Sequence, residues 1–382
     1  MKQTARIVST YAADVSGVCS ALYELGGMTV MHDASGCNST YSTHDEPRWY
    51  DMDSLVFISG LSEMEAVMGD DEKLVSDIVE AASELHPKFI ALAGTPIPML
   101  IGTDFPALAA LCEERTGIPS FGFPTNGMHS YLSGASMAFE TLAERFAQEG
   151  VPKMDGLSAN LLGVTPLDFS VNGSAASMET LLRENGFALV SNWAMGSSLT
   201  NLEKAGGASV NLVVSYSGLA AAKTLKARFG TPYVVGTPMA GAFSEKLLAA
   251  LRSSVADGMN RVLCAERKSA PDAEIAIIGE SVFSGSLAAA IEAETGKSVR
   301  VVCPLETETM LLAPCDVCAA DEDELDPSLK SAKTVIADPL YHPICPKDAH
   351  FVPLPHEAFS GRIYRADIPD LSLSLKNLLE VL

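Results

Sequence analysis

The residues of this sequence with the clearest chemical potential are its eight cysteines. Two lie near the N-terminus and four crowd the C-terminal part of the chain: Cys19, Cys37, Cys303, Cys315, Cys318 and Cys345. The sequence begins without a secretory signal pattern, which disfavours a disulfide framework and favours thiolate–metal chemistry. Thiolate sets of this kind select Zn²⁺ or iron–sulfur clusters. The remaining two, Cys112 and Cys264, lie in stretches with a helical pattern, and we expect them to be small buried side chains.

The composition bounds the class of protein. A chain of 382 residues with 47% hydrophobic residues is long enough for two or three domains, each with its own core. The formal net charge of −22 argues against nonspecific binding to nucleic acid or to an anionic membrane. This charge serves solubility or forms a docking face for a basic partner. No run of about 18 apolar residues occurs, so we expect a cytoplasmic protein without a membrane-spanning helix.

Hydrophobic patterning predicts an α/β fold made of three Rossmann-like domains in series, each with a parallel sheet. Short runs rich in Val, Ile, Leu and Phe alternate with longer amphipathic runs, which is typical of parallel strands covered by helices. Strand candidates form three groups of about four, between residues 28 and 123, 161 and 236, and 274 and 353. The expected domains are residues 1–152, 153–268 and 269–382. No GxGxxG or GxxxxGK[ST] motif appears, which leaves nucleotide binding by those routes unsupported.

The C-terminal cysteines follow strand candidates of the third domain. Because ligands collect at the carboxyl ends of parallel strands, we expect these thiols along one edge of that domain. The four, Cys303, Cys315, Cys318 and Cys345, could hold a [4Fe–4S] cluster or a structural zinc ion. The alternative is a set of scattered buried cysteines with one chance CxxC pair.

Several histidines lie near the same kinds of strand end. His342 precedes Cys345 by three residues, and His356 shares a loop with Glu357. A lone histidine is more often a packing residue than a ligand, whereas His32 and His44, which flank Cys37, could orient a metal-bound thiolate.

Dispersed motifs resemble those of nitrogenase component 1 and its relatives, which include the dark-operative protochlorophyllide reductases. Cys19 and the element His32-Asp33-Ala34-Ser35-Gly36-Cys37 resemble the first two cluster cysteines of that family. Further resemblances lie in the following elements: residues 61–74, Thr95-Pro96 leading to Ile101-Gly102-Thr103-Asp104, and Ser215 through to Phe229-Gly230-Thr231-Pro232-Tyr233. The order and spacing of these elements make chance agreement improbable.

The resemblance implies electron transfer. In this family an ATP-hydrolysing iron–sulfur reductase docks and passes electrons to a cluster at a subunit interface, which feeds a site among three Rossmann-like domains. Pro96 stands where the family has a third cluster cysteine, so Cys19 and Cys37 alone remain in each chain. The resemblance therefore implies a homodimer, or a dimer with a related chain, that bridges one [4Fe–4S] cluster through these two thiols.

A second departure concerns the catalytic cofactor. Ser215 stands at the position similar to the cysteine that holds the large nitrogenase cofactor, and serine is a poor ligand for soft iron. His356 resembles the family's cofactor histidine, with spacing one residue shorter. We therefore expect reduction of a small or tetrapyrrole-like substrate, with a second cluster on the C-terminal cysteines and with His356 and His342 as proton donors. Two other classes remain open, namely a scaffold or carrier for metallocofactor assembly and a non-catalytic binding module.

Overall fold

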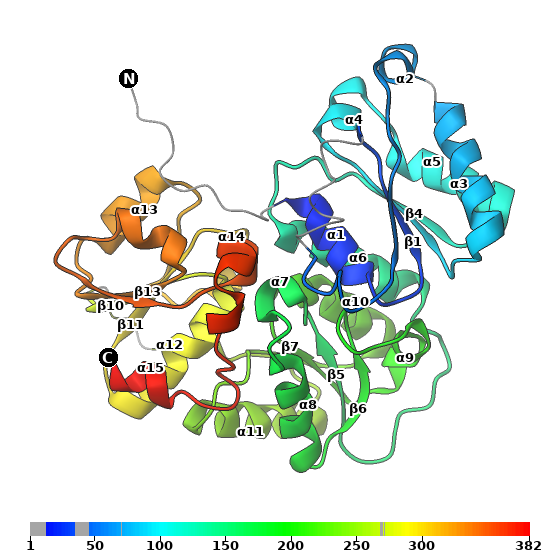
Figure 1. Ribbon diagram of the computed structural model, residues 1–382. Coiled ribbons are helices and arrows are strands. Elements are labelled where there is room, and N and C mark those ends of the chain that lie inside the picture. The colour runs from blue at the N-terminus through cyan, green and yellow to red at the C-terminus, as the bar shows by residue number, and fades with distance from the viewer. Residues whose placement is uncertain (1–12, 35–45, 70, 268–269, 271) are drawn as a thin grey trace.

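The computed structural model describes residues 13–34, 46–69, 71–267, 270 and 272–382. Cys37 and His44 lie outside these ranges. The described chain forms three parallel sheets flanked by helices, so the expected α/β fold class is confirmed (Figure 1). None of the helices in the described ranges is long and apolar enough to cross a lipid bilayer.

The first sheet has the strand order β2-β1-β3-β4. Its strands are β1 (Met28–Met31), β2 (Leu55–Ile58), β3 (Ile90–Ala93) and β4 (Ser120–Phe123). Its helices are α1 (Asp14–Leu22), α2 (Glu63–Met68), α3 (Asp71–Leu85), α4 (Pro96–Ile101), α5 (Phe105–Thr116) and α6 (Tyr131–Arg145). Every residue of β1 and β3 is buried, as expected for central parallel strands with helices on both faces.

The second sheet has the order β6-β5-β7-β8-β9. Its strands are β5 (Ser158–Leu162), β6 (Ala188–Asn192), β7 (Val210–Val213), β8 (Tyr233–Val235) and β9 (Arg261–Val262). Its helical segments are α7 (Pro166–Phe169), α8 (Ser174–Glu184), α9 (Leu199–Glu203), η2 (Ala205–Gly207), η3 (Tyr216–Gly218), α10 (Leu219–Phe229) and α11 (Ala242–Asp257).

The third sheet has the order β12-β11-β10-β13-β14. Its strands are β10 (Ile275–Ile278), β11 (Val299–Cys303), β12 (Val317–Cys318), β13 (Thr334–Ala337) and β14 (His350–Pro353). The helical segments are α12 (Ser281–Thr295), η4 (Thr309–Leu311), α13 (Glu322–Leu329), η5 (Pro339–Ile344), α14 (Glu357–Ser360), η6 (Gly361–Ile363), η7 (Arg365–Asp367) and α15 (Lys376–Glu380).

The expected strand groups overlap twelve of the strands, although the candidate at residues 161–165 shares only two residues with β5. Two short edge strands, β9 and β12, had no signal in the hydrophobic pattern. The second and third sheets share one hydrophobic core. The C-terminal segment contributes Leu371, Leu375 and Leu378 to this core, beside Leu247 of α11. The backbone N–H of Ala240 also donates to the carbonyl of Leu371 at 2.9 Å. The C-terminal segment therefore packs against both the second and the third sheet.

Helices α1 and α6 pack with their backbones in close contact. A Cβ on Gly17 would lie 1.9 Å from the carbonyl oxygen of Tyr131, and a Cβ on Gly134 would lie 1.8 Å from that of Asp14. Glycine is therefore required at both positions for the helices to approach this closely. This contact sets the position of Tyr131, at the start of α6, opposite α7.

Candidate active site

The topology of the second and third sheets creates two crevices. In each sheet the order in which successive strands are added reverses at a switch point. This point lies between β5 and β7 in the second sheet and between β10 and β13 in the third. Ligands of open parallel sheets bind at such points, beyond the carboxyl ends of the strands. Four buried polar residues follow these strands: Asp168 after β5, Ser215 after β7, Glu280 after β10 and Asp338 after β13.

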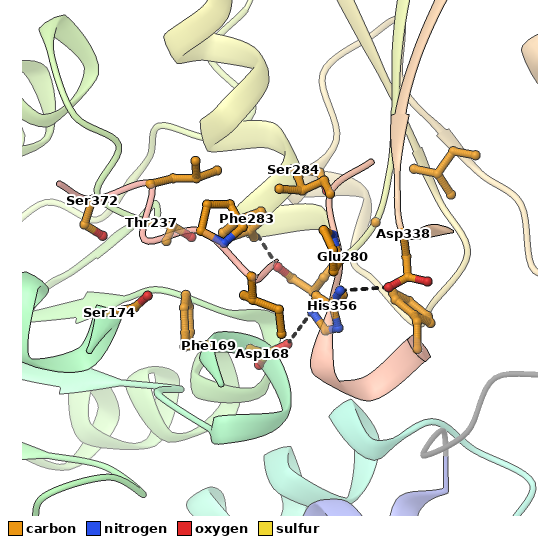
Figure 2. A pocket seen from close by; sticks show the side chains of 18 of the residues that line it. Asp168, Phe169, Ser174, Thr237, Glu280, Phe283, Ser284, Asp338, His356 and Ser372 are labelled. Carbon is orange, nitrogen blue, oxygen red and sulfur yellow. Dashed lines mark hydrogen bonds and ion pairs between the residues drawn. The ribbon is translucent and has the colours of Figure 1, made fainter. Parts of the chain in front are cut away.

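The two crevices meet in one cavity (Figure 2). It has about 30 Å³ of free volume, which is room for about two water molecules. Its walls come from both sheets and from the C-terminal segment, and they carry Asp168, Glu280, Asp338 and His356 together with apolar side chains such as Phe283. No lysine or arginine is among the described residues that line it. The cavity therefore presents acids and one imidazole to a ligand.

Asp168 is the cavity acid that is held by side-chain hydroxyls alone. Its Oδ1 accepts a hydrogen bond from the Tyr131 hydroxyl at 2.5 Å. Its Oδ2 accepts from the hydroxyls of Ser215 at 2.7 Å and Thr165 at 3.1 Å. Burial raises the pKa of Asp168 to about 6, although these three hydrogen bonds favour the charged form. Burial and the adjacent Asp168 also raise the pKa of Tyr131 well above its ordinary value, so this phenol stays protonated and serves as a donor.

Glu280 caps the N-terminus of α12 and faces the same cavity. Its Oε1 accepts from the backbone N–H of Val282 at 2.9 Å and of Tyr216 at 3.0 Å, and its Oε2 accepts from that of Phe283 at 2.7 Å. Burial, with the charge of Asp168 as the second cause, raises the pKa of Glu280 to about 7. Asp168 and Glu280 influence each other and therefore titrate as a pair, with protonated carboxyl present near neutral pH.

His356 completes the cavity from the loop after β14. Its Nδ1 accepts a hydrogen bond from the backbone N–H of Ala358 at 3.2 Å, so the proton of the neutral ring lies on Nε2. Nε2 faces Oδ1 of Asp168 at 3.7 Å. Burial lowers the pKa of His356 to about 4, which keeps the ring neutral at physiological pH. Asp338 anchors the loop by accepting from the backbone N–H of His356 at 2.8 Å and from the Ser360 hydroxyl at 2.7 Å.

Glu357, an acid outside the cavity lining, holds α14 against α7. Glu357 is fully buried and accepts a hydrogen bond from the Ser170 hydroxyl at 2.8 Å. Arg365 donates to both of its carboxylate oxygens, with Nε 3.0 Å from each. Ser170 adopts φ 53° to end α7, a strained backbone for serine that these contacts stabilise. These contacts hold α14 against α7, and His356, which precedes α14, therefore faces Asp168.

Of the two histidines expected to donate protons, the structure brings only His356 to the cavity. His342 is exposed and stacks on Phe351, with ring centroids 4.5 Å apart, outside the residues that line the cavity. The structure therefore does not bring His342 together with His356, and its role as a proton donor stays a prediction.

The four C-terminal cysteines do not converge on one point. In the described part of the chain, no three His, Cys, Asp or Glu side chains gather in an arrangement that could hold a metal ion. Cys303 and Cys318 are neighbours at the ends of β11 and β12, whereas the thiol of Cys315 approaches Asp316 and that of Cys345 donates to the carbonyl of Tyr341 at 3.3 Å. This arrangement does not fit the four-thiolate cluster or zinc site that the sequence suggested.

Cys19 lies in α1 and is fully buried in a hydrophobic core that the first and second sheets share. Burial, with the charge of Glu46 as the second cause, raises the pKa of its thiol. Cys37, its expected partner, lies outside the described residues. The described chain thus supplies one of the two thiols expected for a shared cluster. Cys112 and Cys264 are buried, as expected.

Sequence reasoning missed the acids of the cavity. Asp168, Glu280 and Asp338 each follow a strand that was expected, and each stands within six residues of its end. A signal in the sequence could have identified them, because each is a single acid that follows an apolar strand. Tyr131 carried no such signal, because its role depends on the packing of α6 against α7.

Three comparisons relate the chain to known proteins. A family model described as nitrogenase component 1 type oxidoreductase matches residues 17–309. The nitrogenase iron-molybdenum cofactor biosynthesis protein NifE of Clostridium pasteurianum is 29% identical over 184 residues, which cover 47% of this chain and 38% of that protein. A light-independent protochlorophyllide reductase polypeptide of Nostoc punctiforme is 26% identical over 180 residues, which cover 45% of this chain and 35% of that protein.

The fold is similar to that of solved relatives. A structure of nitrogenase Cp1 at pH 5 superimposes with a TM-score of 0.66 at 15% identity, over 100% of this chain and 90% of that one. In sequence, the chain spans little more than a third of the length of the curated relatives above.

Glu280→Gln tests the raised pKa of the cavity acid. A carboxyl whose folded pKa exceeds its unfolded value stabilises the fold at low pH, and that stability is lost as the pH rises from the unfolded value toward the folded one. Between pH 5 and pH 8 the wild-type chain should therefore lose about 3 kcal/mol that the glutamine variant retains. Urea unfolding of both proteins at the two pH values measures this difference, to which Asp168 also contributes because it titrates together with Glu280. An equal pH dependence would show that Glu280 titrates normally.

Proposed function

Because the chain belongs to the nitrogenase component 1 type oxidoreductase family, we propose that it is an iron–sulfur oxidoreductase subunit that reduces a small substrate in the cavity between the second and third sheets. The electrons would come from an ATP-dependent iron–sulfur reductase, and a second chain would complete the assembly. The observation that carries the proposal is the buried group of Asp168, Glu280 and His356 at the two switch points.

The cavity residues suit the proton half of a reduction. Reducing an unsaturated bond by one step consumes two electrons, which the reductase partner supplies, and two protons. Glu280, with its pKa near 7, holds a proton that it can transfer, and the Asp168–Glu280 pair regains protons from solvent between turnovers. The Nε2–H of neutral His356 is placed to orient the substrate by a hydrogen bond.

The size and donor set of the cavity favour a small substrate over a large cofactor. Among the described residues, no cysteine lines the cavity. The hydroxyl of Ser215 already donates a hydrogen bond to Asp168. These oxygen groups do not fit the soft iron of an iron–molybdenum cofactor. A free volume of about 30 Å³ also falls far short of a tetrapyrrole, which would need the surrounding elements to move apart.

A shared cluster would lie at the carboxyl edge of the first sheet. Cys37 follows β1 in the sequence, and Cys19 lies in α1, so two chains related by a two-fold axis would supply four thiolates. A [4Fe–4S] cluster held by them would accept and release single electrons. Binding would require the buried thiol of Cys19 to lose its proton, which couples cluster assembly to pH.

The same edge carries an exposed apolar surface. Methionine and leucine side chains of α2, α4 and the loop after β4 are largely exposed: Met64 at 72%, Met68 at 72%, Leu100 at 78% and Met128 at 76%. Contiguous exposed apolar groups mark interaction sites, and soluble monomers rarely keep them open. We propose that a second copy of this chain, or a related chain, covers this surface.

A role as scaffold or carrier for metallocofactor assembly is the second candidate. It is favoured by the similarity to NifE, a protein whose name assigns it to cofactor biosynthesis. Transfer of an assembled cluster to a cluster-free acceptor, without turnover of a small substrate, would support this role.

Iron and acid-labile sulfide in anaerobically purified protein test the shared cluster. One [4Fe–4S] cluster in a dimer gives about two irons per chain. Cys19→Ala and Cys37→Ala should each abolish the iron content, because neither leaves four thiolates. The exposed Cys318 provides the control, since Cys318→Ala should keep the wild-type iron content. Full iron content in the Cys37→Ala variant, or iron lost from the Cys318 variant alone, would contradict the assignment.

Leu100→Asp tests the proposed interface. A carboxylate in the centre of a buried apolar contact has no partner and disfavours association, so the mass in solution should fall to that of one chain. Because Leu100 is exposed, the free energy of unfolding should stay within about 0.5 kcal/mol of wild type. Val171→Asp, also exposed but on the loop after α7, is the control and should remain a dimer. An unchanged mass for Leu100→Asp would place the interface elsewhere.

Electron delivery tests the oxidoreductase role itself. With an ATP-hydrolysing iron–sulfur reductase and excess dithionite, the electron paramagnetic resonance signal of a reduced cluster should appear only when ATP is present. Glu280→Gln should accept electrons at the wild-type rate but lose substrate-dependent reoxidation, since it retains the fold and lacks the transferable proton. ATP-independent reduction together with cluster transfer to an acceptor would instead support the scaffold.

A further inference from the structure

Two cysteines of the third sheet lie side by side on neighbouring strands. Strands β11 and β12 are parallel, and Cys303 and Cys318 are partners in their register. Neighbouring strands are about 4.8 Å apart, and partners in a parallel register point to the same face. This separation lies within the range of about 4.4–6.8 Å between the Cα atoms of disulfide-bonded cysteines.

Their thiols also converge. Cys303 Sγ lies 3.5 Å from the carbonyl oxygen of Leu305, and Cys318 Sγ lies 3.8 Å from the same oxygen. Both S–H groups therefore point toward one acceptor on one side of the sheet. Cys303 is fully buried, whereas Cys318 is exposed on the edge strand. One thiol is thus open to reagents in solution and the other lies behind it.

The CxxC spacing in the sequence suggests a different pair, Cys315 with Cys318. The structure directs the Cys315 thiol toward Oδ1 of Asp316, 3.8 Å away. That carboxylate is part of the fold, because it pairs with the buried Arg267 and accepts from the backbone N–H of Val301 at 2.8 Å. The geometry therefore favours the partner across the strands over the partner in the motif.

We propose that Cys303 and Cys318 form a reversible dithiol–disulfide site. The exposed Cys318 sulfur attacks the disulfide bond of a small oxidant such as oxidised glutathione and forms a mixed disulfide while one glutathione thiol leaves. Cys303 then attacks the Cys318 sulfur, closes the intrachain disulfide and releases the second glutathione thiol. The two protein S–H protons end on the two thiols released, and the protein loses two electrons to the oxidant. The site uses neither Cys19 nor Cys37 and does not depend on the proposed function.

Disulfide mapping of the wild-type chain tests this pairing. The protein is treated with oxidised glutathione, free thiols are blocked with N-ethylmaleimide, and the chain is cleaved after Glu306 and before Asp316. These cuts place Cys303, Cys315 and Cys318 on three different peptides. Mass spectrometry should find the Cys303 and Cys318 peptides joined, and dithiothreitol should separate them. Labelling of Cys318 by iodoacetamide should fall about tenfold on oxidation.

Matched variants identify the partner. Cys315→Ser should form the same crosslink as wild type, and Cys318→Ser should form none. A link between the Cys315 and Cys318 peptides would overturn the proposal. A mixed disulfide with glutathione that persists on Cys318 would also overturn it, as would N-ethylmaleimide on both Cys303 and Cys318 after the oxidation step. None of these outcomes alters the iron content expected from Cys19 and Cys37, so the two proposals succeed or fail independently.

Discussion

The central constraint on this structure is the burial of the Asp168 carboxylate where the three α/β units meet. Tyr131 reaches it from the first unit, Thr165 and Ser215 from the second, and His356 faces it from the third. An unpartnered carboxylate would be costly to bury, and the three hydroxyl donors offset much of that cost. Because these donors come from separate units, the carboxylate is fully satisfied only when the units are docked. The close approach of α1 and α6 at Gly17 and Gly134 is part of the same requirement.

The burial that makes Asp168 structurally demanding also sets its chemistry. Desolvation raises the pKa of Asp168 and Glu280, while it lowers the pKa of His356, so near neutral pH Glu280 still carries a proton part of the time and the imidazole is neutral. Glu280 differs from Asp168 in its donors, which are backbone N–H groups at a helix N-terminus. Those groups cannot rearrange when the carboxyl gains or loses a proton. A fixed polar setting of this kind lets the proton move without reorganising the fold.

The sequence predicted the strands well and the site only in part, for separable reasons. Runs such as Ile275–Ile278 are apolar on both faces, and a buried parallel strand requires nothing more. The two-residue strand β12 has no such run, and its position depends on pairing with β11. The sequence grouped Cys303, Cys315, Cys318 and Cys345 as one metal site, but spacing along a chain does not report which thiols lie together across a sheet. The sequence marked His356 only by a resemblance to the family's cofactor histidine, and it is the packing of α14 against α7 that places His356, and not His342, in the cavity.

Cys19 and the acids of the cavity lie on different elements, and this arrangement bears on how a reduction could proceed. Cys19 lies in α1, which precedes the first sheet, whereas Asp168 and Glu280 lie at the switch points of the second and third. Thiolate-bound clusters hold their electrons more or less tightly according to nearby charge and hydrogen bonds. Acids that titrate beside a cluster would change its potential with each proton they released. Placing the proton donors on other sheets would leave the potential of a shared cluster steadier while Glu280 cycles between its two forms.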